Sequence, residues 1–238
     1  MITLKTHIST EDFKDLASTT DFNCVSIYCP IHTGEKVSKN NLSLLITKVE
    51  QKLIAKGIDH SEAQNIIGRL EQILNNDSLW EEEEFKQDKT LIIFSNDNNI
   101  QTFIVQNVFD NCIHITSNYY LLPLFKKASN TQLIEDSLKI KQVVFNEDLT
   151  TNRLEKIIPL AFESKIARLY VSSKNGVYGV YDTVNKTTMI DNEKNNQNMS
   201  LINLAAITTY LYGGQVNIVD PMFMPTKGTT IQAILKTK

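Results

Sequence analysis

The amino-acid sequence predicts an α/β protein made of two domains. The chain has 238 residues, which is long for one average domain and sufficient for two domains with separate cores. In each half, segments with apolar residues at helical spacing alternate with short β-rich segments, an order typical of α/β architecture. Residues 128–150 between the halves show no clear amphipathic repeat. We therefore expect an N-terminal domain over residues 1–128 and a C-terminal domain over residues 137–238.

The first half predicts a helical hairpin over a mixed sheet. A short polar helix around residues 9–16 precedes a β-rich run, residues 22–29, which Pro30 is expected to end. Two amphipathic helices follow, over residues 42–53 and 63–74. The remaining segments are three strands and a closing segment, expected over residues 90–95, 100–105, 112–115 and 119–127.

The second half predicts an α/β sandwich. Two helices and four strands are expected, with the helices over residues 151–164 and 201–212 and the strands over residues 166–172, 177–181, 215–219 and 230–235. The dipeptide Asn175-Gly176 lies between the first two of these strands, and Asn-Gly is typical of a tight hairpin turn. We therefore expect those two strands to pair with each other.

The motif Gly213-Gly214-Gln215 has the same three letters as the catalytic tip of peptide-chain release factors. A working tip is a mobile, exposed loop with polar flanks, whereas here an apolar helical face ends at Leu211 and a β-type alternation follows over residues 216–219. Glycine tolerates the left-handed conformation that ends many helices. We therefore interpret the three residues as a structural turn between a helix and a strand.

Composition and charge limit the possible partners. Residues 1–127 contain 12 Lys and Arg against 17 Asp and Glu, and residues 128–238 contain 12 against 10. Phosphate backbones are bound through several Lys or Arg contacts, so neither half predicts a strong, free-standing nucleic-acid binder. Weak or composite binding to RNA is compatible with this balance.

Several classes of site have no support in the sequence. The cysteines, Cys24, Cys29 and Cys112, are odd in number and scattered in apolar stretches, so we expect buried reduced thiols and no metal. We expect no cofactor, because the chain has neither a phosphate-binding glycine loop nor a nucleophile motif. The absence of a long apolar run and of a basic-then-apolar N-terminus predicts no membrane association and a cytoplasmic location.

The loop after Pro30 is the best candidate for a binding surface. His32 follows Tyr28 in an expected exposed turn, and Lys36 and Lys39 lie downstream. These residue types suit an anion or an RNA phosphate. An ordinary polar loop remains the alternative interpretation. The acidic run at residues 81–84 is expected to be a solvated helix face rather than a cation site.

Ordered patches in both halves resemble the bacterial relatives of archaeo-eukaryotic release factors. In the first half these patches are residues 25–30, 32–34, 79–80, 90–94 and 120–124. In the second half they are residues 177–182, 213–214, 224–225 and 233–235. The resemblance spans most of the chain, and it implies an N-terminal domain and a C-terminal α/β domain similar to that of release factors and Pelota. The central domain of the family is missing here, because only about two dozen residues separate Lys127 from the C-terminal pattern.

The resemblance implies a non-catalytic protein that binds the ribosome, or an RNA or protein partner associated with translation. A catalytic role is not carried over to Gln215, because the tripeptide lies inside the C-terminal pattern rather than in a central domain. One alternative is a peptidyl-tRNA ester hydrolase acting through Gly213, Gly214 and Gln215. Another is a protein-interaction module unrelated to translation, whose acidic first half docks a basic partner.

Overall fold

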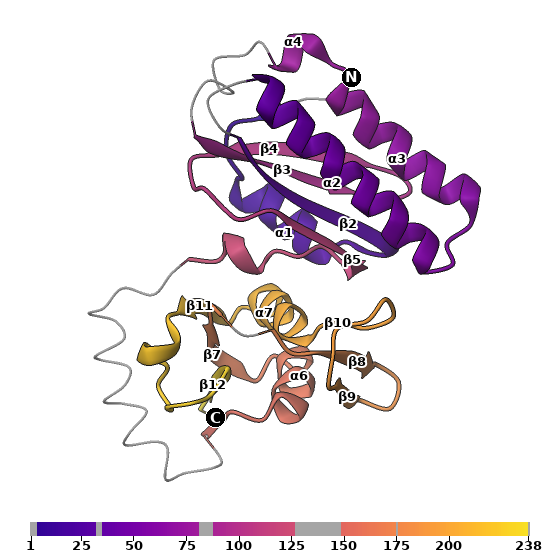
Figure 1. Ribbon diagram of the computed structural model, residues 1–238. Helices are drawn as coiled ribbons and strands as arrows, with labels where there is room; N and C mark the ends of the chain where they lie inside the picture. The colour runs from indigo at the N-terminus through magenta and orange to yellow at the C-terminus, as the bar shows by residue number, and fades with distance from the viewer. Residues whose placement is uncertain (1–3, 32–34, 81–87, 127–148, 175, 238) are drawn as a thin grey trace. The chain divides into compact units, whose positions relative to one another are not determined.

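The computed structural model describes residues 4–31, 35–80, 88–126, 149–174 and 176–237. Its mixture of helices and strands confirms the predicted α/β class. The chain divides into two compact units, Met1–Tyr120 and Leu121–Lys238, called unit 1 and unit 2 below (Figure 1). None of the helices in the described ranges combines the length and the apolar character needed to cross a bilayer.

Unit 1 is a five-stranded mixed sheet with helices on its faces. Its elements are β1 (Leu4–Lys5), α1 (Thr10–Ser18), β2 (Thr20–Ile31), α2 (Glu35–Ala55), α3 (His60–Leu74), α4 (Asp77–Trp80), β3 (Lys89–Ser95), β4 (Ile100–Val105) and β5 (Cys112–Asn118). The strand order is β1-β4-β3-β2-β5, in which only β1 and β4 are parallel. The antiparallel helices α2 and α3 lie across one face of this sheet (Figure 1).

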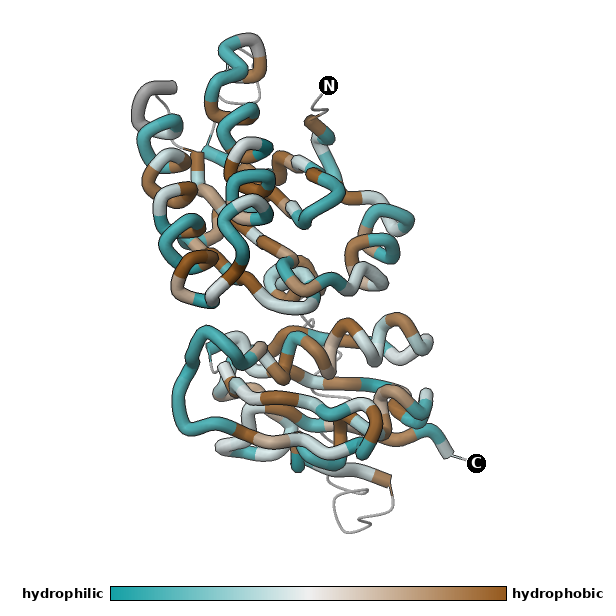
Figure 2. Tube along the Cα trace, turned by 90° about the vertical axis from the view of Figure 1, so that its right-hand side faces the viewer, coloured by the Kyte–Doolittle hydropathy of each residue, from teal (hydrophilic) through white to brown (hydrophobic). Residues whose placement is uncertain are grey.

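The core of unit 1 follows the two-residue period of its central strand. Alternate residues of β2, including Ile27 and Cys29, belong to the apolar cluster that α2 and α3 cover. Tyr28 lies on the other face, where its ring contacts Phe94 and Phe109 edge to face. From Asn23 onward both faces of β2 are therefore buried. Figure 2 shows that apolar and polar residues are also interspersed along the two long helices, as in helices with one apolar face.

The expectation that Pro30 ends its strand is wrong, because β2 continues to Ile31. Pro30 is the register partner of Thr90 in β3, whereas the pairing of β2 with β5 stops at Tyr28. The carbonyl oxygen of Pro30 accepts a hydrogen bond from the side chain of Asn41 at 3.3 Å, so this side of Pro30 faces away from β3. The N–H that proline lacks would point to the same side as this carbonyl. The pairing with β5 has already ended there, so no hydrogen bond between strands is lost.

A capping box begins α1. The hydroxyl of Ser9 accepts a hydrogen bond from the amide of Asp12 at 3.0 Å, and the Asp12 carboxylate accepts one from the amide of Ser9 at 3.0 Å. The carboxylate also forms an ion pair with Lys5. The hydrogen bonds from Lys5 and Ser9 lower the pKa of Asp12 from 3.8 to about 2. This network ties β1 to the start of α1.

Unit 2 contains a mixed four-stranded sheet, an antiparallel three-stranded sheet and two helices that pack together. Its elements are η2 (Leu122–Leu124), β6 (Thr150–Thr151), α6 (Leu154–Phe162), β7 (Ile166–Ser172), β8 (Tyr178–Asp182), β9 (Thr187–Asp191), β10 (Met199–Ser200), α7 (Leu201–Leu211), β11 (Gln215–Val219), η3 (Pro221–Phe223) and β12 (Ile231–Leu235). One sheet has the order β11-β7-β12-β6 and the other the order β10-β8-β9. Helix α7 contacts strands of both sheets, which explains why it is buried along most of its length.

The hairpin predicted at Asn175-Gly176 is wrong. The strands before and after it, β7 and β8, belong to different sheets. The hairpin of this region instead joins β8 to β9. Its turn is held by the carboxylate of Asp182, which accepts hydrogen bonds from the amides of Val184 and Asn185 at 2.8 and 3.0 Å.

The segment that was expected to close the first domain belongs to unit 2 from Leu121 onward. The side-chain oxygen of Asn203, in the first turn of α7, accepts hydrogen bonds from the amides of Leu121 and Leu122 at 2.9 and 3.1 Å. Further along, the carbonyl of Lys126 accepts a hydrogen bond from the amide of Ile218 in β11 at 3.1 Å. These bonds place the division between the units before the predicted limit at residue 128.

Candidate functional site

The glycines of the release-factor-like tripeptide end helix α7. The amides of Gly213 and Gly214 donate to the carbonyls of Tyr210 and Thr209 at 3.1 and 2.8 Å, and Gly213 has a φ of +79°. A Cβ on Gly214 would lie 2.5 Å from the Thr209 methyl carbon and 2.7 Å from the carbonyl oxygen of Ile166. The first glycine therefore supplies the left-handed turn, and the second permits close packing of the turn.

Gln215 is the first residue of β11 and is held by the adjacent strand. Its register partner is Arg168 of β7, and its side-chain oxygen accepts a hydrogen bond from Nε of Arg168 at 3.1 Å. Its side chain is exposed. The tripeptide thus lies in a turn between a packed helix and a paired strand.

The four binding candidates of unit 1 are not brought together in the described structure. Tyr28 is fully buried, and its hydroxyl donates to the carbonyl of Tyr120 at 2.6 Å, so the expectation that it takes part in surface binding is corrected: its ring is part of the core. Lys39 lies 2.7 Å from a carboxylate oxygen of Asp77, with Nζ over the Trp80 ring. His32 and the side chain of Lys36 lie outside the described residues.

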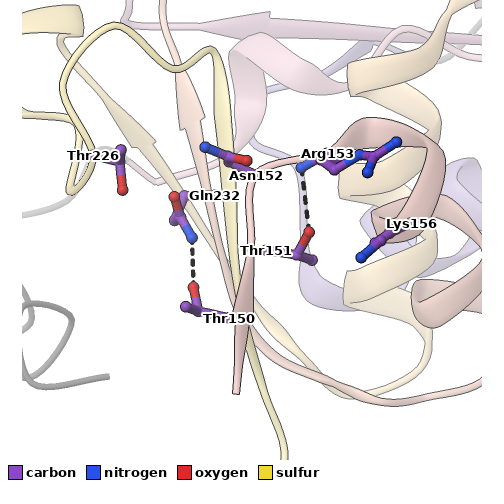
Figure 3. A pocket seen from close by; sticks show the side chains of 7 residues that line it. All are labelled: Thr150, Thr151, Asn152, Arg153, Lys156, Thr226 and Gln232. Carbon is purple, nitrogen blue, oxygen red and sulfur yellow. Dashed lines mark hydrogen bonds between the residues drawn. The ribbon is translucent and has the colours of Figure 1, made fainter. Parts of the chain in front are cut away.

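A polar hollow of about 260 Å³ is present in unit 2 (Figure 3). It lies where β6 leads into the first turn of α6, beside β12 and the loop that precedes β12. The residues that line it are all polar or charged, and two of them are cations. They are Thr150, Thr151, Asn152, Arg153, Lys156, Thr226 and Gln232.

The charges of the hollow are positive. Arg153 and Lys156 are both exposed, and neither forms an ion pair within the part of the chain that the structure describes. Arg153 is also the N-cap of α6, and no side chain caps the amides of the first turn. Backbone N–H groups without a side-chain cap and the positive end of the helix dipole favour an anion at this position. Glu155, in the same turn, partly offsets this field.

Gln232 forms a buried wall of the hollow, with 2% of its surface exposed. The hydroxyl of Thr150 donates to the carbonyl of Ala233 at 2.8 Å, so its oxygen is left to accept a hydrogen bond from the Gln232 amide nitrogen. This fixes the orientation of the amide. The side-chain oxygen then lies on the opposite side from Thr150 and has no hydrogen-bond partner (Figure 3).

Sequence reasoning missed this hollow for a topological reason. Its residues come from positions 150–156, which span the end of the expected inter-domain junction and the expected start of a helix, and from two positions near the C-terminus. They meet only because the two-residue strand β6 pairs with β12, where Thr150 and Ile234 are register partners. A two-residue strand has no periodicity that a sequence pattern could reveal.

Metal and thiol chemistry have little support in the described residues. No group of three or more His, Cys, Asp or Glu side chains in the described ranges is placed to hold a metal ion. Cys24 and Cys29 are buried free thiols, and burial raises the pKa of each to about 12, so both are protonated at neutral pH. His114 is buried in β5, with its ring stacked on Tyr120 at 3.7 Å.

Neither the protein-family models nor the curated proteins include a match to this chain. Two cations, uncapped helix amides and threonine hydroxyls together suit an anionic ligand such as a phosphate.

Proposed function

We propose that this chain is a non-catalytic, cytoplasmic RNA-binding protein of the release-factor-like family, which associates with the ribosome through ribosomal RNA. The observation that carries the proposal is the hollow of unit 2, where Arg153 and Lys156 face a polar lining without carboxylate partners among the described residues. Arginine, lysine, hydroxyl groups and helix N-termini are the groups that proteins most often place against nucleic-acid phosphates.

The number of cations limits the strength of this binding. Two cations neutralise few phosphates, so the affinity of the hollow alone is modest and falls as salt rises. The small positive balance of residues 128–238, with 12 basic against 10 acidic side chains, agrees with such a contact. Ribosome binding through a composite surface that includes the hollow accounts for both features.

The non-catalytic part of the proposal is supported by the position of Gln215. Ester hydrolysis by a release tip requires a loop that can enter a distant active centre. In this chain both glycines bond to the last turn of α7, and Gln215 pairs with β7. Moving the tripeptide would break the end of the helix and the start of the strand.

Co-sedimentation with purified ribosomes at low and at high salt tests the proposal. We expect the chain to pellet with ribosomes at low salt and to be released at high salt, because counterion release dominates phosphate contacts. Absence from the ribosome pellet in both conditions would overturn the proposal. Association that is insensitive to salt would instead indicate an apolar protein contact and would also overturn the RNA assignment.

A further inference from the structure

We infer that unit 2 binds a single-stranded segment of RNA, with phosphates in the hollow and a base stacked on the exposed ring of Phe223. This inference rests on the proposed function and specifies which form of RNA the same site takes. It follows from a rigid loop that borders the hollow and carries apolar side chains in solvent.

The loop between β11 and β12 exposes two large apolar side chains. Met222 and Phe223, in η3, are 75% and 52% exposed. Single exposed apolar residues are common on protein surfaces. An aromatic ring close to a cationic hollow is more specific, because proteins that bind single-stranded nucleic acids combine cations for the backbone with aromatic rings for the bases.

Bonds at the start of the loop hold this ring in place. The carboxylate of Asp220 accepts a hydrogen bond from the amide of Met222 at 3.1 Å, and the carbonyl of Asp220 accepts one from the amide of Phe223 at 2.9 Å. The next residue, Met224, is buried against Tyr170 in the core. Because the backbone is anchored on both sides of Phe223, little conformational entropy remains to be lost when a ligand binds the ring.

The same loop reaches the hollow three residues later. Thr226 lines the hollow, and in Figure 3 it lies at one side, with Arg153 and Lys156 at the other. Three peptide units span at most about 11 Å, so the Cα atom of Phe223 lies within that distance of the Cα atom of Thr226. An RNA strand that crosses the hollow from the two cations to Thr226 therefore brings its next bases within reach of Phe223.

The charge of the loop suits this path. Lys227, which follows Thr226, is exposed and forms no ion pair in the described parts of the chain. Asp220 is the one acidic residue among residues 220–230, and it lies at the opposite end of the loop. The side of the hollow that faces away from Arg153 thus has a cation of its own for the phosphates that follow.

The ring selects single-stranded over duplex RNA. In a duplex the bases are paired and stacked on one another, so no base face is free for a side chain. The bases of single strands and loops can be splayed out and stacked on aromatic rings. Substitution of Phe223 should therefore weaken binding of a single strand and leave binding of a duplex unchanged.

Fluorescence polarisation of the full chain with a labelled single-stranded RNA 12-mer, and with the duplex of this strand and its complement, tests the inference. Phe223→Ala removes the ring, Phe223→Leu keeps an apolar side chain without it, and Phe223→Trp keeps an aromatic surface. Phe22→Ala is the matched control, because Phe22 is an exposed aromatic residue of unit 1. Thermal unfolding checks that each variant is folded.

We expect Phe223→Ala and Phe223→Leu to lose roughly 5- to 150-fold in affinity for the single strand, the range for one stacked base, and less than about twofold for the duplex. Phe223→Trp and Phe22→Ala should stay within about twofold of the wild type on both probes. An unchanged affinity of Phe223→Ala for the single strand, an equal loss on the duplex, or full affinity in Phe223→Leu would overturn the inference.

Ribosome co-sedimentation of the same variants separates this inference from the proposed function. A Phe223→Ala variant that leaves the ribosome but keeps its affinity for the RNA would overturn the inference and assign the ring to a ribosomal protein. If the inference fails while the wild type still associates with ribosomes in a salt-sensitive way, the proposed function stands and only the assignment of the ring fails.

Discussion

The side-chain oxygen of Gln215 accepts a hydrogen bond from Nε of Arg168 at 3.1 Å, and the two residues are also register partners in the parallel pair β11–β7. The glutamine of the tripeptide is therefore part of a sheet. Its backbone is fixed by the ladder, and its side chain lies along the neighbouring strand. A sequence identical to a catalytic tip has a structural use here, because its neighbours are a buried helix and a buried strand.

Gln215→Ala is expected to leave the chain folded and to have no effect on its association with ribosomes. The side chain is exposed and its bond to Arg168 is a surface contact, so the loss of stability should be about 0.5 kcal/mol. Thermal unfolding measures the stability, and co-sedimentation measures the association with ribosomes. A peptidyl-tRNA hydrolysis assay tests the hydrolase alternative. Hydrolysis by the wild type that disappears in Gln215→Ala without a change of melting temperature would support the hydrolase alternative and contradict this account.

Gly214→Ala is expected to destabilise unit 2 by about 2–4 kcal/mol, because the new methyl group would overlap the Thr209 side chain and the rigid carbonyl of Ile166. Gly213→Ala meets open space but keeps a φ of +79°, so its loss should be nearer 1 kcal/mol. Chemical denaturation of the pair measures the order of the two effects. A larger loss for Gly213→Ala would show that the turn is not packed as described.

The fold was predictable from the sequence where elements are long and one-sided. Helix α3 and the strands β3 and β4 lie within three residues of their expected bounds, whereas helix α2 begins at Glu35, seven residues before its expected start at residue 42. Two of the errors concern the end of the long, buried strand β2 at Pro30 and the pairing of the exposed strand β9. Strand β9 has exposed residues at Met189 and Ile190, so it lacks an apolar face, and its pairing with β8 depends on tertiary contacts.

The candidate site was less predictable than the fold. Tyr28 is a predicted binding residue because it precedes a polar loop, but the sequence does not reveal that β2 is covered on both faces at this position, so that the Tyr28 ring is internal. The hollow depends on a contact between residues about 80 positions apart, Thr150 and Gln232, which no local pattern encodes. The turn at Gly213-Gly214 was recognisable because an apolar helical segment precedes it and a β-rich segment follows it.

Asn203→Ala is expected to destabilise unit 2 by about 2–4 kcal/mol. The substitution leaves the amides of Leu121 and Leu122 without the acceptor that both use in the described structure, and each unsatisfied buried donor costs about 1–3 kcal/mol. Asn152→Ala, at an exposed asparagine, is the matched control and should stay within about 0.5 kcal/mol of the wild type. Urea denaturation distinguishes the two. Equal stability of the two variants would argue against the attachment of residues 121–126 to unit 2.

Asp12→Asn is expected to weaken the start of α1 by about 1 kcal/mol at neutral pH, since it breaks the capping box and the ion pair with Lys5. The pKa of Asp12 is lowered from 3.8 to about 2 in the folded chain, so the unfolded chain binds the proton more readily. The stabilisation is therefore complete above about pH 4 and is lost as the pH falls through about 2. Urea denaturation between pH 2 and 7, with Glu11→Gln as the control in the same turn, measures the difference. A difference that does not shrink toward pH 2 would contradict the assignment.

The most direct test of the account is ribosome co-sedimentation of the wild type beside the Arg153→Ala/Lys156→Ala double variant at low salt. The control is Lys165→Ala/Lys174→Ala, which removes the same number of charges at positions that do not line the hollow. The account predicts that the wild type and the Lys165/Lys174 variant pellet with ribosomes, whereas the Arg153/Lys156 variant remains in the supernatant. A wild-type chain that stays in the supernatant, or an Arg153/Lys156 variant that pellets as fully as the wild type, would contradict it.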